Sequence, residues 1–167
     1  MDQHGHHDGE RRRAVTYAIQ RESFTETYKE IEHLYREHYA EMCSRLAEQG
    51  IYMSDYNPRL DVYDNACKGG WLITLIVRLD GEAVGYLNVY VTHDMHNRDL
   101  IAQEDTIFIT KSHRNGIGKK LVLAGLEELK QRGVKRLTVN ALTDLRVAKL
   151  WQRIGFKHSA HTMTYTF

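Results

Sequence analysis

The chain has 167 residues, of which 42% are hydrophobic and 27% are charged, and its formal net charge at pH 7 is +1. This profile is typical of one compact domain with a buried core, and it excludes a protein whose whole surface is basic for nucleic acid. The two cysteines, Cys43 and Cys67, make neither a disulfide framework nor a Cys-based zinc site, which indicates a reducing compartment.

The N-terminal residues lack the apolar stretch of a signal peptide, and no apolar run approaches the roughly 18 residues of a membrane span. We therefore expect a cytoplasmic protein without a membrane partner. Residues 1–12 are polar and aperiodic, which predicts a disordered tail before one domain over residues 13–167. His4, His6 and His7 could hold a metal loosely, but no Cys or carboxylate cluster completes a site, so we expect no metal.

The first part of the domain is predicted to contain one strand and two helices. Apolar alternation predicts the strand over residues 15–19, and apolar residues at helical spacing predict a long helix from Ser23 to Gln49. Asn57-Pro58 has the form of a helix start, which predicts a second helix that ends near Ala66.

The rest of the chain is predicted to contain three successive strands and then alternating helices and strands. Two runs rich in β-forming residues, 71–79 and 83–93, flank Asp80-Gly81, which is a strong hairpin signal. The remaining predicted elements are a strand over residues 105–110, a helix that opens within 112–118 and ends at Gly133, a strand over 136–141, a helix over 144–154 and a last strand over 162–167. This order predicts a single α/β domain, and the last strand could pair across a homodimer.

The segment DTIFITKSHRNGIGKKL leads from a strand through a loop with two glycines directly into a helix. The first N–H groups of a helix have no partner within it and lie at the positive end of its dipole, so they attract phosphate. Gly116 and Gly118 allow close approach to that backbone, and four Lys and Arg side chains add positive charge. A plain strand-to-helix turn with solvated lysines is the alternative. The dinucleotide pattern GxGxxG fails at Leu121, and GxxxxGK[ST] fails at Lys120.

Three runs, FITKSHRNGIGKKLV, KRLTVNAL and DLRVAKLWQRIGF, together resemble the GNAT superfamily of acyl-CoA N-acyltransferases. In that family a strand leads into an R/Q-x-x-G-x-G/A loop, and a later helix ends in Gly-Phe. The resemblance covers residues 71–167 well. It implies an α/β (α+β) fold with one GNAT-like domain, in which a mixed, mostly antiparallel sheet is flanked by helices and splayed between the strands near 105–110 and 136–141. The sequence departs from the family at His113, Asp144 and Trp151, which replace Arg or Gln, Asn and Tyr.

The resemblance implies that acetyl-CoA is the cosubstrate and that an amine attacks its thioester directly. Pantetheine is then expected along the strand before the loop, and pyrophosphate on the N–H groups of residues 114–119. The cofactor-binding residues expected on this basis are Ile107, Phe108, Ile109, Arg114, Asn115, Gly116, Ile117, Gly118, Lys119, Asp144 and Trp151.

An alkyl ammonium must lose a proton before it attacks, and a carboxylate on the same strand is the usual base. We prefer Asp105, with Glu104 second. Strand alternation places Asp105 on the face of Ile107 and Ile109 and Glu104 on the opposite face, with Thr106 and Phe108, so at most one points into the cleft. A surface carboxylate without a catalytic role is the alternative for each.

A proton donor for the departing thiolate is the remaining catalytic requirement. The indole of Trp151 cannot supply the proton that the family's Tyr supplies. Tyr165 on the predicted last strand is a candidate donor, and Tyr86 and Tyr90 are alternatives, although most tyrosines in such a domain belong to the core.

The charge is unevenly distributed along the chain. Residues 1–104 carry 11 basic and 18 acidic side chains, whereas residues 105–167 carry 12 and 4. The basic half matches a polyanionic cosubstrate, and the acidic half hints at a cationic acceptor, although a solvated helix face explains it equally well. The acceptor itself is open between protein Lys or N-terminus, a small amine and aminoacyl-tRNA. The alternative function is a catalytically weak GNAT-fold module that binds CoA and a protein or nucleic-acid partner.

Overall fold

The computed structural model describes residues 15–142 and 145–167, which form a five-stranded sheet with helices on both faces. The predicted tail over residues 1–12 and the predicted site residue Asp144 lie outside the described residues. The strands are β1 (Tyr17–Glu22), β2 (Leu72–Leu79), β3 (Glu82–His93), β4 (Leu100–Ile109) and β5 (Arg136–Thr138). The helices are α1 (Phe24–Ala47), α2 (Leu60–Lys68), α3 (Ile117–Gln131) and α4 (Leu145–Ile154), with a 3₁₀ turn, η1 (Lys111–His113), before α3.

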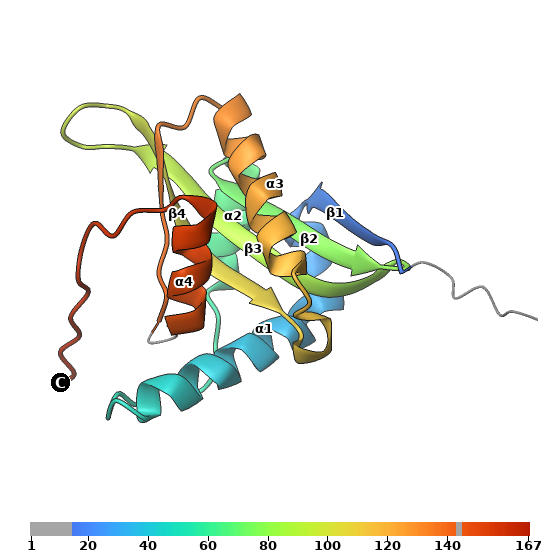
Figure 1. The fold of residues 1–167 in the computed structure, drawn as a ribbon, viewed down its shortest axis with the longest axis horizontal. Coiled ribbons are helices and arrows are strands. Elements are labelled where there is room, and N and C mark those ends of the chain that lie inside the picture. The colour runs from blue at the N-terminus through green and yellow to red at the C-terminus, as the bar shows by residue number, and fades with distance from the viewer. Residues whose placement is uncertain (1–14, 143–144) are drawn as a thin grey trace, which may run out of the picture.

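The strands lie in the order β1-β2-β3-β4-β5. The first four pair antiparallel, and β5 pairs parallel with β4, so the predicted mixed and mostly antiparallel sheet is confirmed. Asp80 and Gly81 both have positive φ, at 49° and 90°, as a tight hairpin between β2 and β3 requires. Helices α3 and α4 cover one face, and α1 and α2 cover the other (Figure 1).

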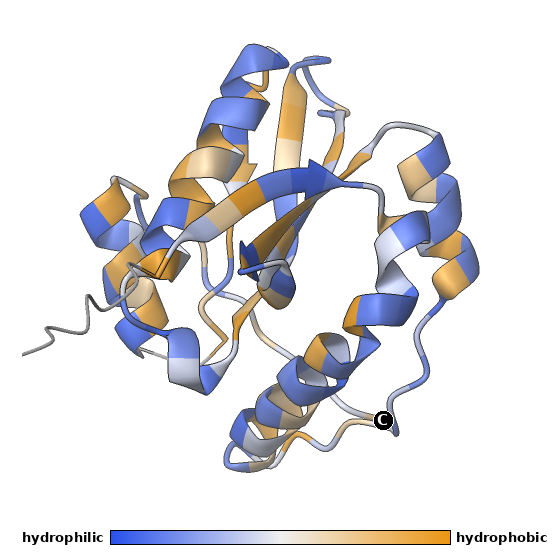
Figure 2. Ribbon diagram, turned by 90° about the vertical axis from the view of Figure 1, so that its right-hand side faces the viewer, coloured by the Kyte–Doolittle hydropathy of each residue, from blue (hydrophilic) through white to orange (hydrophobic). Residues whose placement is uncertain are grey.

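Two hydrophobic cores lie on the two sides of the sheet. The core under α3 includes Leu121 of the helix and Leu87 of β3, and the core under α1 and α2 includes Ile31 and Tyr86. Apolar residues concentrate on the strands and on the inward sides of the helices (Figure 2). A Cβ at Gly125 would lie 2.7 Å from Leu87 Cδ2, so this glycine lets α3 cross the sheet closely.

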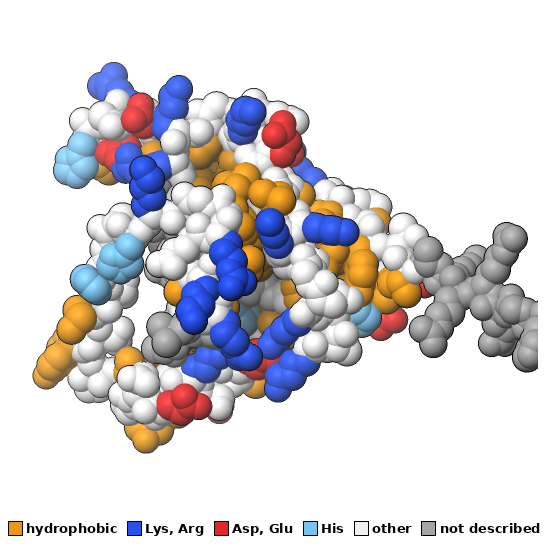
Figure 3. All heavy atoms as spheres, in the orientation of Figure 1, with side chains coloured by type: hydrophobic (Ala, Val, Ile, Leu, Met, Phe, Trp, Pro, Cys, Tyr) orange, Lys and Arg blue, Asp and Glu red, His pale blue; other side chains and the backbone are white. Residues whose placement is uncertain are grey.

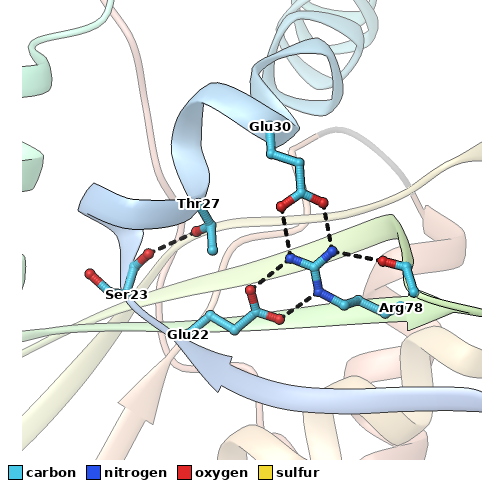
Figure 4. A network of polar contacts seen from close by, with 6 residues as sticks. Glu22, Ser23, Thr27, Glu30 and Arg78 are labelled. Atoms are coloured by element: carbon cyan, nitrogen blue, oxygen red, sulfur yellow. Dashed lines mark hydrogen bonds and ion pairs between the residues drawn. The ribbon is translucent and has the colours of Figure 1, made fainter.

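The start of α1 is fixed to the edge of the sheet by Arg78. Its guanidinium binds Glu22 of β1, at 2.7 and 2.8 Å, and Glu30 of α1, at 2.6 and 3.0 Å (Figure 4). It also donates to the carbonyl of Gly81. The geometry is bidentate to both carboxylates, which is the stronger form of such a pair. These contacts therefore set the angle at which α1 leaves β1.

Several predicted elements differ from the structure. α2 begins at Leu60, after the N-cap Arg59, so the helix start predicted at Asn57-Pro58 is wrong. β4 begins at Leu100, five residues earlier than expected, and β5 ends at Thr138. Residues 162–167 form no strand, so the predicted last strand is wrong. The Thr and aromatic residues there have strand propensity, but that propensity reflects packing against a neighbouring strand, and the structure places none beside them.

No helix within the described residues is long and apolar enough to cross a membrane. The same residues contain no group of three or more His, Cys, Asp and Glu side chains arranged to hold a metal ion.

Candidate active site

β4 carries a bulge at Asp105. Asn88 of β3 pairs with Thr106 and the next residue, Val89, pairs with Glu104, so the register passes over Asp105. A bulge leaves the extra residue outside the ladder and turns its side chain out of simple alternation. The bulge therefore decides which face of the sheet each of the two neighbouring carboxylates occupies.

Asp105 points to the α1 and α2 face of the sheet. The hydroxyl of Tyr63, on α2, donates to Asp105 Oδ2 at 2.8 Å. Tyr63 packs against the same core as Phe108, whereas Ile107 and Ile109 pack on the opposite core. The expectation that Asp105 shares a face with Ile107 and Ile109 is wrong, because strand alternation does not continue through a bulge.

The carboxylate of Asp105 is accessible and yet poorly hydrated. The residue is exposed, while the protein around its carboxyl raises the pKa from its ordinary value. Burial is the main cause, and hydrogen bonds from Tyr63 and Thr106 act in the opposite direction. A raised pKa makes the carboxylate a stronger base than a free one.

Glu104 lies on the other face and is only 8% exposed. Ala102, two residues earlier, belongs to the core under α3, so the expected grouping of Glu104 with Phe108 is also wrong. The backbone N–H of Asn140 donates to Glu104 Oε2 at 3.2 Å. Burial, together with the negative charge of Asp105, raises the pKa of Glu104 to about 7, although the Asn140 hydrogen bond lowers it.

Strands β4 and β5 part just beside these carboxylates. Their pairing runs from Ile101 and Arg136 to Gln103 and Thr138 and ends there, while β4 continues to Ile109. The Glu104 side chain spans the start of this gap to reach Asn140. The predicted splay is therefore present, and Glu104 stands at its closed end.

Trp151 of α4 closes the same corner from the other side. It is 5% exposed, packs on Phe156 and donates its indole N–H to the carbonyl of Asn140 at 3.0 Å. Glu104 and Trp151 thus bind the N–H and the C=O of one residue, which holds the chain after β5 in place. The predicted cofactor-binding residue Trp151 has its single donor engaged within the protein.

The N-terminus of α3 is open to an anion. Gly116 occupies the N-cap with φ at 96°, a value that favours glycine, and no described side chain caps the helix. Ile117 is buried, and the exposed backbone turn around Gly116 and Gly118 leads into Lys119 and Lys120. Figure 3 shows Lys and Arg side chains gathered over α4 and this end of α3. The exposed basic residues of η1, the loop after it, the start of α3 and α4 are Lys111, Arg114, Lys119, Lys120, Arg146, Lys149 and Arg153.

Arg114 turns away from that open helix end. Its Nε donates to the carbonyl of Ile109 at 2.7 Å, and its Nη2 binds the carboxylate of Glu41 on α1 at 2.8 and 3.0 Å. The guanidinium also lies 5.4 Å from the centre of the Phe108 ring. The side chain expected to bind pyrophosphate therefore ties the loop to α1 in this structure.

Tyr17 of β1 supports the same loop and was not recognised from the sequence. Its hydroxyl lies 3.1 Å from His113 Nδ1 and accepts a hydrogen bond from Asn115 Nδ2 at 3.4 Å. The side chains of His113 and Asn115 are thus held at the start of the sheet. Asn115 can serve an anion through its backbone, but its amide side chain already has a partner.

Tyr165 does not reach the carboxylates on β4. Its side chain is 80% exposed, and its described ring contact is with Phe167 at 5.0 Å. The prediction that Tyr165 stands on a strand beside the gap is wrong, because residues 162–167 do not join the sheet.

Sequence reasoning missed two further side chains, Tyr63 and His38, that the fold brings to the site. Tyr63 lies 42 positions before Asp105, and only the packing of α2 on the sheet makes them neighbours. His38 of α1 places Nδ1 3.0 Å from the Tyr86 hydroxyl and stacks on Phe108. Burial lowers the pKa of His38 to about 4, so its imidazole is neutral at pH 7. An aromatic residue on an apolar helix face gives no sign of such contacts.

Several solved structures are similar to this chain. An aminoglycoside acetyltransferase from an uncultured soil metagenomic sample is 19% identical, with a TM-score of 0.69 over 91% of this chain and 99% of that one. AAC(6′)-Iy, in complex with the bisubstrate analogue CoA-S-monomethyl-acetylneamine, is 17% identical, with a TM-score of 0.69 over 91% and 98%. A ribosomal-protein-alanine N-acetyltransferase from Brucella melitensis biovar Abortus 2308 is 18% identical, with a TM-score of 0.63 over 90% and 99%.

Each similarity covers nearly the whole chain of the compared protein, and it shows that the fold is shared. No curated protein matches this chain. The sequence itself matches the Acetyltransferase (GNAT) family over residues 15–156, which include the bulged β4, the loop before α3 and the Gly-Phe end of α4. The chain therefore belongs to the GNAT acetyltransferase family.

Proposed function

We propose that the protein is an N-acetyltransferase that transfers the acetyl group of acetyl-CoA to an amine by direct attack of the amine nitrogen. One observation carries this proposal. The bulge sets Asp105 and Glu104, both with raised pKa, on a strand that parts from β5 at this point and runs on to the open N-terminus of α3. This reaction needs a base for the acceptor ammonium, a gap for the thioester and an anion site for the pyrophosphate, and this one strand lies beside all three.

The residues around the gap fit acetyl-CoA as a substrate. Beyond Gln103 the β5 side of β4 is without a strand partner, so backbone groups of residues 107–109 can pair with the pantetheine amides. The N–H groups at the start of α3 suit the pyrophosphate, with Lys119 and Lys120 beside them. Since Arg114 is bound to Glu41, we assign the pyrophosphate charge to these lysines rather than to Arg114.

Asp105 is the base in this proposal. An alkyl ammonium has a pKa of about 10.4, so almost all of the acceptor is protonated at neutral pH and cannot attack. Asp105 is exposed on the α1 and α2 face of the sheet, and Tyr63 holds its carboxylate in one orientation. It removes the proton, and the free nitrogen attacks the thioester carbonyl. A backbone N–H of β4 at the bulge stabilises the oxyanion.

Glu104 is the second candidate for the base. Its pKa of about 7 suits proton transfer at neutral pH, but the carboxyl is buried and already accepts a hydrogen bond from Asn140. In either case the nitrogen–carbon bond forms first and gives the oxyanion, whose collapse then breaks the carbon–sulfur bond and releases the thiolate. No described side chain is assigned to protonate the departing thiolate.

Release of free thiol from acetyl-CoA in the presence of amines tests this function. Asp105→Asn is expected to lower kcat by about 100-fold, the effect of losing a general base, with acetyl-CoA affinity measured by calorimetry unchanged. Glu104→Gln is the matched comparison, because it changes the neighbouring carboxylate on the other face. A larger loss in Glu104→Gln would transfer the role of base to Glu104.

The alternative function predicts a different result. Clear acetyl-CoA binding without thiol release above background, for peptides, small amines and aminoacyl-tRNA alike, would favour a CoA-binding module and overturn the enzyme proposal.

A further inference from the structure

A row of aromatic rings leads outward from Asp105. The hydroxyl of Tyr63 donates to Asp105, the Tyr63 ring lies 6.3 Å from that of Tyr90, and Tyr90 lies 5.9 Å from Trp71. Phe24 stacks on Tyr63 at 4.6 Å, which fixes the inner end of the row against the core. We call Tyr63, Tyr90 and Trp71 the aromatic row. Its members come from α2, from β3 and from the residue before β2.

The aromatic row differs from the core aromatics because solvent reaches it. Trp71 is 44% exposed, Tyr63 and Tyr90 are half-buried, and Asp105 is exposed, whereas Tyr86 is fully buried. Burial raises the pKa of Tyr90 to about 12, and the negative charge of Asp105 adds to that rise, which places the carboxylate near this phenol as well. A ligand at Asp105 can therefore contact the rings without displacing the core.

Part of the acidic charge that hints at a cationic acceptor is neutralised within the protein. Ion pairs link Arg78 to Glu22 and Glu30, Arg36 to Glu32, Arg114 and Arg45 to Glu41, Arg59 to Asp61 and Arg136 to Asp94. Asp105 differs from these, since its hydrogen-bond donors, Tyr63 and Thr106, are neutral. The charge at the inner end of the aromatic row thus matches a single ammonium group.

We propose that the acceptor is a monoamine whose ammonium binds Asp105 and whose flat apolar body stacks along the aromatic row toward Trp71. This inference rests on the proposed function and names the class of amine that it uses. Aromatic rings attract both a cation near their faces and another flat ring. An aminoglycoside, the substrate class named for two similar structures, would bring several ammonium groups to a row of neutral rings that has the carboxylate of Asp105 at its inner end.

Three amines test the class: phenylethylamine, hexylamine and the polycationic neamine, each with saturating acetyl-CoA and thiol release as the readout. We expect kcat/KM for phenylethylamine to exceed that of hexylamine by about tenfold, the worth of one or two ring contacts, and that of neamine by more. Trp71→Ala is expected to raise KM for phenylethylamine by about tenfold and for hexylamine by less than twofold. kcat and the KM for acetyl-CoA should not change. Tyr52→Ala, at an aromatic side chain that is 80% exposed outside the row, is the matched control.

Amine binding can also be followed without turnover. Phenylethylamine should shift the fluorescence of Trp71 in the protein without acetyl-CoA, and Trp71→Phe should remove that shift. A preference for neamine, or an unchanged KM for phenylethylamine in active Trp71→Ala, would overturn the inference and leave the enzyme proposal intact. A fluorescence titration without thiol release would support the aromatic row as a binding site and overturn the enzyme proposal instead. Absence of both signals would overturn both.

Discussion

Arg114, in the loop before α3, is ion-paired with Glu41 of α1, with 2.8 Å between Nη2 and Oε1. The pair joins the loop assigned to the pyrophosphate to a helix on the opposite face of the sheet. Because Nε of the same guanidinium binds the carbonyl of Ile109, the contact also reaches the end of β4. Arg114 therefore belongs to the framework of the loop.

We predict that Lys119→Ala weakens acetyl-CoA binding more than Arg114→Ala does. Lys119 is exposed at the start of α3, where its ammonium can bind a phosphate. Arg114, in contrast, is ion-paired with Glu41. The expected loss for Lys119→Ala is about tenfold in Kd at low salt, and it should shrink at high salt because the charge is exposed. Calorimetry measures both variants. A larger loss for Arg114→Ala would mean that the arginine leaves Glu41 when acetyl-CoA binds.

The stability of the fold should fall as pH rises toward 7 because of Glu104. Its pKa is about 7 in the folded protein against an ordinary value of 4.5, so between these values the folded state binds more protons than the unfolded state. The stabilisation is complete below pH 4.5 and is lost as pH rises through 7, by about 3 kcal/mol at most. Urea unfolding of Glu104→Gln should show this dependence removed. Glu127→Gln, at an exposed position on α3, should retain it.

His38 should give the opposite dependence at lower pH. Its folded pKa of about 4 lies below the ordinary 6.5, so the unfolded state binds more protons between these values. Stability from this residue is full above pH 6.5 and declines as pH falls through 4. His38→Asn keeps an acceptor for the Tyr86 hydroxyl and should flatten the acid side of the urea profile. An unchanged slope below pH 6.5 would contradict the buried neutral imidazole.

Tyr165→Phe is expected to leave kcat unchanged within twofold. The phenol is exposed and its described contact is with Phe167, so its hydroxyl is not placed to reach a thiolate beside β4. Steady-state kinetics at pH 6, 7 and 8 check this. A fall in kcat of tenfold or more in the variant at all three pH values would show that the C-terminal residues fold onto the site during turnover.

Local chemistry made part of this structure predictable from the sequence. The Asp80-Gly81 hairpin and the helix that begins after Gly116 depend on backbone angles that few residues adopt, so a short window of sequence is enough. The loop at the start of α3 was predictable from its glycines, and the parting of β4 from β5 was implied by the resemblance to the GNAT family.

The contacts of the candidate base could not be predicted in the same way. Whether Asp105 or its neighbour stands outside the ladder is decided by the pairing of β3 with β4, which a single strand does not encode. Tyr63 and His38 come from helices whose docking depends on the whole core. Residues 162–167 could not be predicted correctly for the same reason, because strand propensity alone does not form a strand without a neighbouring strand to pair with.

The bulge at Asp105 separates two roles of β4, which are to pack the cores and to carry the candidate base. Before and after the bulge, the side chains of β4 pack in the two cores, but the side chain at the bulge lies outside that alternation. Position 105 can therefore be exchanged, to alter the strength of the base or the charge of the preferred acceptor, without repacking either side of the sheet. One inserted residue makes the chemistry of this strand independently adjustable from its architecture.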